Sequence, residues 1–454
     1  MRDLIEAALR SHDADYVEVR LEESRSSRLS FRGPELDDIG SFISVGGCAR
    51  ALVKGGWGFV SFNDTSDLRR WVEMAVAQAR LAARDDETIR LAPVEPVVDI
   101  VPAEVVKDPA TVSLSQKKAL LEEYNAILLA TPQIQTTSVG YGDAHRRVVF
   151  ASSDGAYIEQ SRIDATARIY AVARDGGEVQ QAGVSLGAIG DFGFVEGRHN
   201  EVREIGRRAA ALLAAPQAPG GERIVVLDPI LAGVFIHEAF GHLSEADFIY
   251  ENPKLREVMV LGRRFGEPLL NVVDGAAIPG LRGSYRYDDE GVPATETHLI
   301  RDGVLSGRLH SRETAGAMGE AATGNARAIS YRFRPIVRMT NTMILPSAAS
   351  FDDLIADIDE GIYAKDWFGG TTSMEMFTFS AAEAYMIRHG RLAEPLRGLV
   401  LSGNVFETLA QIDGVGNDPA VNQGGGCGKY GQSPLPVANG SPHIRIRRCL
   451  VGGQ

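Results

Sequence analysis

The chain has 454 residues, of which 44% are hydrophobic, so it can bury a sizeable core divided over two or three domains and is not a disordered chain. Its formal net charge of −13 disfavours direct binding to nucleic acid or to an anionic membrane, because phosphates are bound by concentrated Lys and Arg. Three cysteines fit a reducing compartment better than a disulfide framework. No apolar run of about 20 residues and no secretory signal are visible. We therefore expect a cytoplasmic protein with no nucleic-acid partner and no membrane partner.

The first part of the chain predicts a small α+β unit over residues 1–95. After a short amphipathic helix, residues 16–22 alternate between apolar and charged side chains, as in a strand with one face buried. Gly55 and Gly56 separate two further strand-like runs and indicate a hairpin. A helix is predicted to begin near Asp67.

A second α+β unit is predicted over residues 105–216. Residues 91–102 carry three prolines in an extended run, which indicates a stiff linker or a connection along a sheet edge. The unit should open with a helix over 113–129, capped by Ser113 or Ser115. It should continue with strands and a closing helix, at 138, 147–150, 166–174 and 202–215.

The rest of the chain, residues 221–454, predicts a third unit that is rich in hairpins. Residues 223–227 form an apolar strand that leads into a helix with Asp228 at the N-cap and Pro229 at the first helical position. Hairpins over 300–305 and 387–392 and a helix over 350–361 are expected further on. The whole pattern favours an α+β fold of several domains, with mainly antiparallel sheets and flanking helices.

The segment His237-Glu238-Ala-Phe-Gly241-His242 contains two potential metal ligands and a potential general base. Its spacing is one residue longer than the usual zinc-protease signature. On a regular helix, residues five apart lie about 140° apart around the axis, so the two imidazoles could not share a metal. We expect Gly241 to supply the backbone freedom that ends or bulges the helix and brings His242 round.

A third metal ligand must come from elsewhere, and the sequence offers two alternatives. Cys427 lies in a glycine-rich loop, Gly424-Gly-Gly-Cys427-Gly-Lys429, that allows close approach of the backbone. Glu245 follows the histidine pair directly, as acidic ligands do in many zinc enzymes. Together with Asp247, it could instead orient the ligating imidazoles.

The ordered set of motifs resembles the TldD/PmbA metalloprotease family, and specifically its TldD-like catalytic branch. The resemblance rests on the histidine segment and its trailing acids, and on three later motifs: Tyr287-Asp-Asp-Glu-Gly291, Arg338-Met-Thr-Asn-Thr342 and Cys427-Gly-Lys-Tyr-Gly-Gln432. It implies that His237, His242 and Cys427 bind Zn²⁺ and that Glu238 is catalytic. Tyr430 departs from the acidic residue expected there, which bears on substrate or partner preference.

The function this implies is hydrolysis of unfolded peptides or leader segments, with Glu238 as general base and a zinc-bound water as nucleophile. The resemblance also implies a closed dimer, either of two copies or with an inactive relative, that holds the substrate as an added β-strand. Gly369, Gly370 and residues 374–379 are candidates for that sheet edge. The alternative is a non-catalytic peptide-binding or scaffolding subunit with a structural zinc; an intact Glu238 beside the metal pair argues against it.

Overall fold

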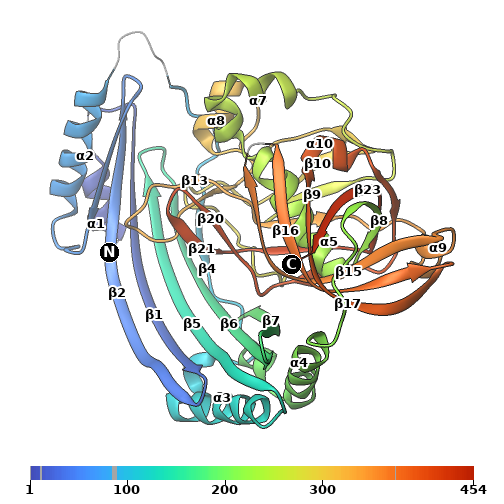
Figure 1. Ribbon diagram of the computed structural model, residues 1–454. Helices are drawn as coiled ribbons and strands as arrows, with labels where there is room; N and C mark the ends of the chain where they lie inside the picture. The colour runs from blue at the N-terminus through green and yellow to red at the C-terminus, as the bar shows by residue number, and fades with distance from the viewer. Residues whose placement is uncertain (1, 11–12, 84–88, 374, 454) are drawn as a thin grey trace.

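The computed structural model describes residues 2–10, 13–83, 89–373 and 375–453 of the chain (Figure 1). A long curved sheet forms one side of the molecule, and the C-terminal part packs against it as a second, rounder body. The architecture is α+β with several domains and mainly antiparallel sheets, as the sequence predicts. None of the helices in the described ranges is long and apolar enough to cross a membrane.

The long curved sheet contains the first seven strands, in the spatial order β3-β2-β1-β5-β6-β4, with β7 paired to β6. The strands are β1 (Tyr16–Arg32), β2 (Glu35–Val53), β3 (Gly56–Phe62), β4 (Val98–Val101), β5 (Ile134–Ser152), β6 (Tyr157–Asp175) and β7 (Glu178–Ile189). Pairing of β1 with β5 joins strands of the predicted units 1–95 and 105–216 in one sheet. The proline-rich connection contributes β4 as an edge strand, parallel to β6.

Four helices cover one face of this sheet in two pairs. They are α1 (Arg2–Leu9), α2 (Leu68–Ala82), α3 (Leu114–Leu129) and α4 (His199–Leu212). Ser113 caps α3 in a reciprocal pair of hydrogen bonds with Gln116, which decides between the two predicted caps. The helix predicted over 202–215 corresponds to α4, which begins and ends three residues earlier.

The first part of β1, residues 16–22, is buried on both faces, although its sequence alternates. Val17 and Val19 pack into the core beneath α1 and α2. The opposite face carries Glu18, Arg20 and Glu22, which are only 3%, 1% and 5% exposed because the C-terminal body covers them. Arg20, for example, donates to the backbone carbonyl of Ser330.

The C-terminal body is built around two six-stranded sheets with a shared hydrophobic core. One has the order β11-β10-β9-β14-β22-β19 and contains β9 (Val272–Gly275), β10 (Glu296–Arg301), β11 (Val304–Leu305), β14 (Asn341–Ile344), β19 (Ala420–Asn422) and β22 (Ala438–Ser441). The other has the order β17-β16-β15-β8-β23-β18 and contains β8 (Gly221–Leu227), β15 (Glu360–Ser373), β16 (Met376–Arg388), β17 (Arg391–Asn404), β18 (Ile412–Val415) and β23 (Ile444–Gly453).

Two small hairpins and six helices complete this body. The small hairpins pair β12 (Ala326–Arg327) with β13 (Ile336–Val337) and β20 (Gly426–Lys429) with β21 (Gln432–Pro436). The helices are α5 (Pro229–Ile236), α6 (Ala246–Glu251), α7 (Pro253–Val258), α8 (Arg312–Met318), α9 (Phe351–Ile355) and α10 (Val405–Leu409). Helix α5 contacts β14 and β22 of one sheet and β15 of the other, so it lies between them.

Both predicted hairpins of this region are confirmed: β10–β11 and β16–β17 are joined by tight turns. The helix predicted over 350–361 is shorter and ends at Ile355, because residues from Glu360 onward form β15 and pair with β16. Sheet pairing across the body thus overrides a helical pattern in the local sequence.

Candidate metal centre

Helix α5 delivers the histidine segment into the interior. Asp228 caps it by accepting a hydrogen bond from the Leu231 backbone N–H at 2.8 Å, and Pro229 occupies its first turn, as predicted. Residues 231–236 are buried on all sides, consistent with an unbroken apolar run. The polar residues that follow therefore enter a space already enclosed by protein.

The helix changes its winding at His237. Residues His237–Gly241 form a π-helical turn, in which the His242 backbone N–H donates to the His237 carbonyl five residues earlier. This turn brings residue 242 over residue 237, so the two rings lie with centroids 5.4 Å apart at 78°. The predicted distortion is confirmed.

The predicted reason for Gly241 is wrong. Its φ of −56° and ψ of −47° are ordinary helical values that any residue adopts. A Cβ at this position would instead lie 2.1 Å from Met339 Sδ. Glycine is needed here because Met339 packs directly against the backbone of the turn.

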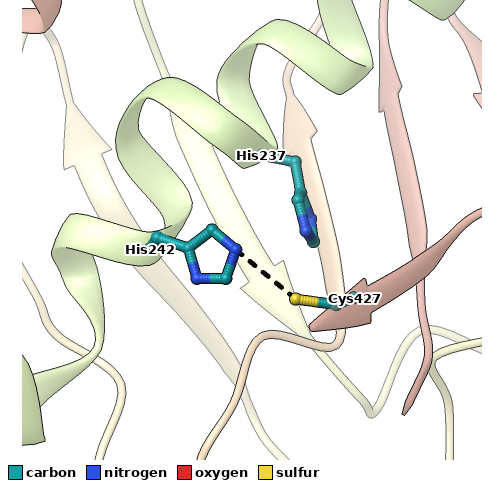
Figure 2. Close-up of side chains that lie close together, drawn as sticks. All are labelled: His237, His242 and Cys427. Carbon is teal, nitrogen blue, oxygen red and sulfur yellow. Dashed lines mark hydrogen bonds between the residues drawn. The ribbon is translucent and has the colours of Figure 1, made fainter. Parts of the chain in front are cut away.

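Strand β20 brings Cys427 to the two histidines (Figure 2). Cys427 Sγ lies 3.5 Å from His242 Nε2, and one ligand atom from each of the three residues lies within 4.8 Å of the others. Cys427 and His237 are each 3% exposed. Figure 2 shows the three side chains pointing toward one another from the helix and the strand.

Glu245 lies behind His242 rather than in the ligand cluster. Its Oε2 accepts from His242 Nδ1 at 3.1 Å, on the ring nitrogen that faces away from Cys427. Its Oε1 accepts from the Met339 backbone N–H at 3.2 Å. Of the two alternatives for the third ligand, the geometry favours Cys427 and gives Glu245 an orienting position.

Glu238 lines a large open cavity next to the cluster. The cavity has a volume of about 830 Å³ and is also lined by His242, by Gly370 to Ser373 of β15, and by Tyr430. The Thr372 hydroxyl donates to the Glu238 carbonyl, which fixes β15 beside the π-helical turn. Glu238 and His242 thus lie on the cavity wall, and His237 and Cys427 are buried behind them.

Comparison with known proteins identifies the family. Three models of the PmbA/TldA metallopeptidase family match the chain: its domain 1 over residues 17–79, its central domain over 107–215 and its C-terminal domain over 220–453. The chain belongs to the TldD/PmbA family.

Relatives of known sequence and structure cover most of the chain. A protein named metalloprotease from Synechocystis is 50% identical over 442 residues, covering 97% of this chain and 95% of its own. A protein named zinc metalloprotease TldD homolog from Saccharolobus solfataricus is 34% identical and covers 71% of this chain and 72% of its own. The crystal structure of TldE from Thermococcus kodakarensis has the same fold, with a TM-score of 0.75 at 18% identity and full coverage of both chains.

Two of the motifs that carry the family resemblance lie away from the cavity. Asp289 and Glu290 of the Tyr287–Gly291 motif form ion pairs with Arg20 and Arg50 of the long curved sheet. In the 338–342 motif, the Thr340 and Thr342 hydroxyls donate to the buried carboxylate of Asp274. The first motif joins the C-terminal body to the sheet. The second holds the body together and reaches the metal centre through Met339, which packs on the π-helical turn and donates its backbone N–H to Glu245.

Sequence reasoning missed the part that Lys429 plays in this site. Its side chain is 2% exposed, and its ammonium lies 3.1 Å from Glu245 Oε2 and 2.6 Å from Asp247 Oδ1. It therefore ties the strand that carries Cys427 to the acid that orients His242. The signal was available: on a strand, residues two apart lie on the same face, so a buried Cys427 predicts a buried Lys429, and a buried ammonium needs carboxylate partners.

The charges of the centre shift the pKa values of its groups. Burial raises the pKa of the Cys427 thiol, but the two histidines outweigh it and hold this pKa well below its usual value of 9. Burial also raises the pKa of the Glu245 carboxyl, which Lys429 and His242 nevertheless lower to about 2. For Glu238, burial is the largest influence, and its pKa lies above the ordinary 4.5. The first two groups are thus held as anions, while Glu238 is made a better proton acceptor.

Proposed function

We propose that this protein is a zinc-dependent peptidase that hydrolyses unfolded peptides or leader segments, with Glu238 as general base. One observation carries the proposal: a buried His-His-Cys cluster stands beside a half-buried glutamate on the wall of an open cavity of about 830 Å³. A purely structural zinc site would be closed by four protein ligands and would have no use for an adjacent base.

The residues of the cluster suit Zn²⁺. Two imidazoles and a thiolate are ligands that zinc prefers, and three protein ligands leave the open position that catalytic sites keep. His237 Nδ1 is buried and has no hydrogen-bond partner among the described residues. Bound there, zinc would act as a Lewis acid toward the scissile carbonyl and lower the pKa of water to about 7.

Glu238 performs the proton transfers. Its raised pKa suits a carboxylate that takes a proton from the attacking water and passes it to the leaving amine. Glu245 and Lys429 hold His242 and the Cys427 strand in place during these steps. The positions of Glu238, of the His-His-Cys cluster and of the cavity support this assignment of roles.

The edge of β15 supports binding of an extended substrate. This strand pairs with β16 along its whole length, whereas its described pairing with β8 on the other side ends at Ala364. Residues Gly370 to Ser373 line the cavity and lie beyond the end of the described pairing with β8. A peptide can add there as a further strand, which selects for unfolded substrates because folded chains have no free strand to offer. The other predicted edge segment, residues 374–379, is not an edge in its described part, because from Met376 onward it belongs to β16, which pairs with β15 on one side and β17 on the other. Met374 itself lies outside the described residues.

The test is Glu238→Gln, which keeps the shape of the side chain and removes the base. We expect peptide cleavage to fall by about 10²-fold to 10⁴-fold while the zinc content stays unchanged. Glu257→Gln on α7 is the matched control, because Glu257 is exposed and does not appear among the described residues that line the cavity. Unchanged cleavage by the Glu238 variant would contradict the mechanism, and equal loss in both variants would point to a general defect.

A further inference from the structure

One wall of the cavity is apolar. Leu243 and Leu255 form its buried base, and the rings of Phe248 and Tyr430 stand above them on the same cavity. The two rings contact edge to face, with centroids 5.6 Å apart at 61°. Tyr430 is 56% exposed, so much of its ring is free to contact a ligand.

The charged group nearest this wall is already engaged. The Lys429 ammonium lies 4.1 Å from the centre of the Phe248 ring, but it is bound by Glu245 and Asp247 and its side chain is 2% exposed. It is therefore not available to a substrate carboxylate. What the wall offers to the cavity is hydrocarbon and aromatic surface, with the carboxylate of Glu251 beside the Tyr430 hydroxyl at 3.5 Å.

Tyr430 occupies a backbone position that does not suit it. The β20–β21 turn consists of Tyr430 and Gly431, both with positive φ, at 49° and 78°. Asn, Asp and Gly are the residues that such two-residue turns prefer, and a bulky residue with positive φ is strained. The equivalent turn at β10–β11 has Asp302 and Gly303 with nearly the same angles. A strained aromatic residue that projects into a cavity indicates a role in binding.

We propose that this wall is a subsite for one large apolar side chain of the peptide, and that the enzyme selects peptides with Phe, Tyr, Leu or Met beside the cleaved bond. The inference rests on the proposed peptidase function and deepens it. The β15 edge on the cavity takes the peptide backbone, and the wall formed by Leu243, Phe248, Leu255 and Tyr430 takes the side chain. Placing an aromatic side chain among these four excludes water from both surfaces.

The experiment measures peptide binding separately from cleavage. Zinc-loaded Glu238→Gln protein is titrated with fluorescently labelled short peptides. The peptides form sets of three that are identical except at one position, which carries Phe, Gly or Asp, and this position differs from set to set. At one position we expect the Phe peptide to bind at least about tenfold more tightly than the Gly peptide, with the Asp peptide weakest. Equal binding of the three peptides at every position would overturn the proposal, as would the absence of any binding.

A second variant assigns the preference to the wall. Tyr430→Asn, combined with Glu238→Gln, removes the ring and places a preferred residue in the turn. It should reduce the Phe-to-Gly affinity ratio several-fold without lowering the melting temperature, because the backbone strain is relieved. Tyr430→Gly serves the same purpose should the Asn variant fold poorly. Tyr250→Ala is the matched control, since this tyrosine is 42% exposed on α6 and is not among the described lining residues. An unchanged ratio in the Tyr430 variants would overturn the proposal.

The outcomes also separate this inference from the proposed function. If wild-type protein cleaves no peptide but the binding preference is found and depends on Tyr430, the subsite stands and hydrolysis fails. If wild-type protein cleaves Phe, Gly and Asp peptides equally well and binding shows no preference, hydrolysis stands and the subsite is wrong.

Discussion

Two buried polar regions of the molecule differ in how their charges are paired. One is the junction between the long curved sheet and the C-terminal body, and the other is the histidine-cysteine cluster. At the junction, Arg50 Nη1 lies 3.1 Å from both Glu18 Oε1 and Glu290 Oε1, so each charge has a partner of opposite sign. In the cluster, two imidazoles and a thiol converge, and His237 Nδ1 has no partner within the described ranges. Paired charges hold domains together, whereas imidazoles and a thiol that converge on one point form a set of atoms that can bind a metal.

The largest effect we expect concerns Cys427. Cys427→Ala removes one of three metal ligands and should abolish stoichiometric zinc binding, weakening affinity by about 10³-fold or more, beyond the 10-fold to 100-fold typical of losing an orienting partner. Metal analysis of the purified protein measures this. Cys449→Ala is the matched control, because Cys449 is equally buried, at 3% exposure, but lies on β23 outside the cluster. If the Cys427 variant kept its full zinc content, the assignment of Cys427 would be wrong and Glu245 would be the third ligand.

Breaking the junction should destabilise the protein without affecting the metal. Arg50→Met leaves Glu18 and Glu290 buried and without their shared cation, which should cost about 3–5 kcal/mol of unfolding free energy. Denaturant titration measures the loss, and zinc content should not change. Arg69→Met on α2 is the control: its pair with Glu73 is exposed and should be worth less than about 1 kcal/mol. Loss of zinc from the Arg50 variant would show that the two regions are not independent.

Zinc affinity should depend steeply on pH, because both histidines must lose a proton before they bind metal. Burial lowers the pKa of each histidine ring, but nearby groups raise it by more. The chief of these groups is Cys427 for His237 and Glu245 for His242, so the pKa of each histidine lies above 6.5. The Cys427 pKa is lowered, so its thiolate is already present at neutral pH. As the pH is lowered below the raised pKa values of the two histidines, the zinc affinity should fall by up to about 100-fold per pH unit.

Competition titrations with a zinc chelator across a pH series test this dependence. Glu245→Gln should shift the decline to lower pH, because it removes the anion that raises the pKa of His242. An affinity that stays constant between about pH 8 and pH 6 would contradict the assignment of the histidines as ligands.

The smallest effect concerns the π-helical turn. In Gly241→Ala the new methyl group meets Met339 Sδ, and relieving this overlap should cost about 1–3 kcal/mol of stability and weaken zinc binding. Combining it with Met339→Ala provides the control. The double variant should be less destabilised than the sum of the two single variants, whereas simple additivity would show that Met339 is not the reason for the glycine.

Much of the centre could be predicted from local sequence. The cap at Asp228, the buried run of α5 and the five-residue spacing of the histidines are properties of one short segment, and that spacing requires a distorted helix if both rings are to reach one metal. The alternating pattern of residues 16–22 likewise identified β1. These predictions held because each depends on backbone hydrogen bonds and neighbours within a few residues.

Other features depend on contacts between distant segments. The alternation of β1 predicts one buried face, yet the face with Glu18 and Arg20 is buried as well, because Arg50 and residues from 288 onward cover it. The helical pattern after Ser350 gives way to β15, whose pairing with β16 and β8 outweighs local propensity.

By itself, then, the sequence determined the α+β class and the position of the histidine pair and Glu238 at the end of a buried helix, and it predicted that a third metal ligand would come from elsewhere. Only the tertiary structure favours Cys427 over Glu245 as the third ligand, because that choice depends on which side of the His242 ring each group reaches: Sγ lies 3.5 Å from Nε2, and Oε2 lies 3.1 Å from Nδ1. It also decided why residue 241 is glycine, since Met339 is nearly a hundred positions away in the chain and touches the turn only in the folded protein.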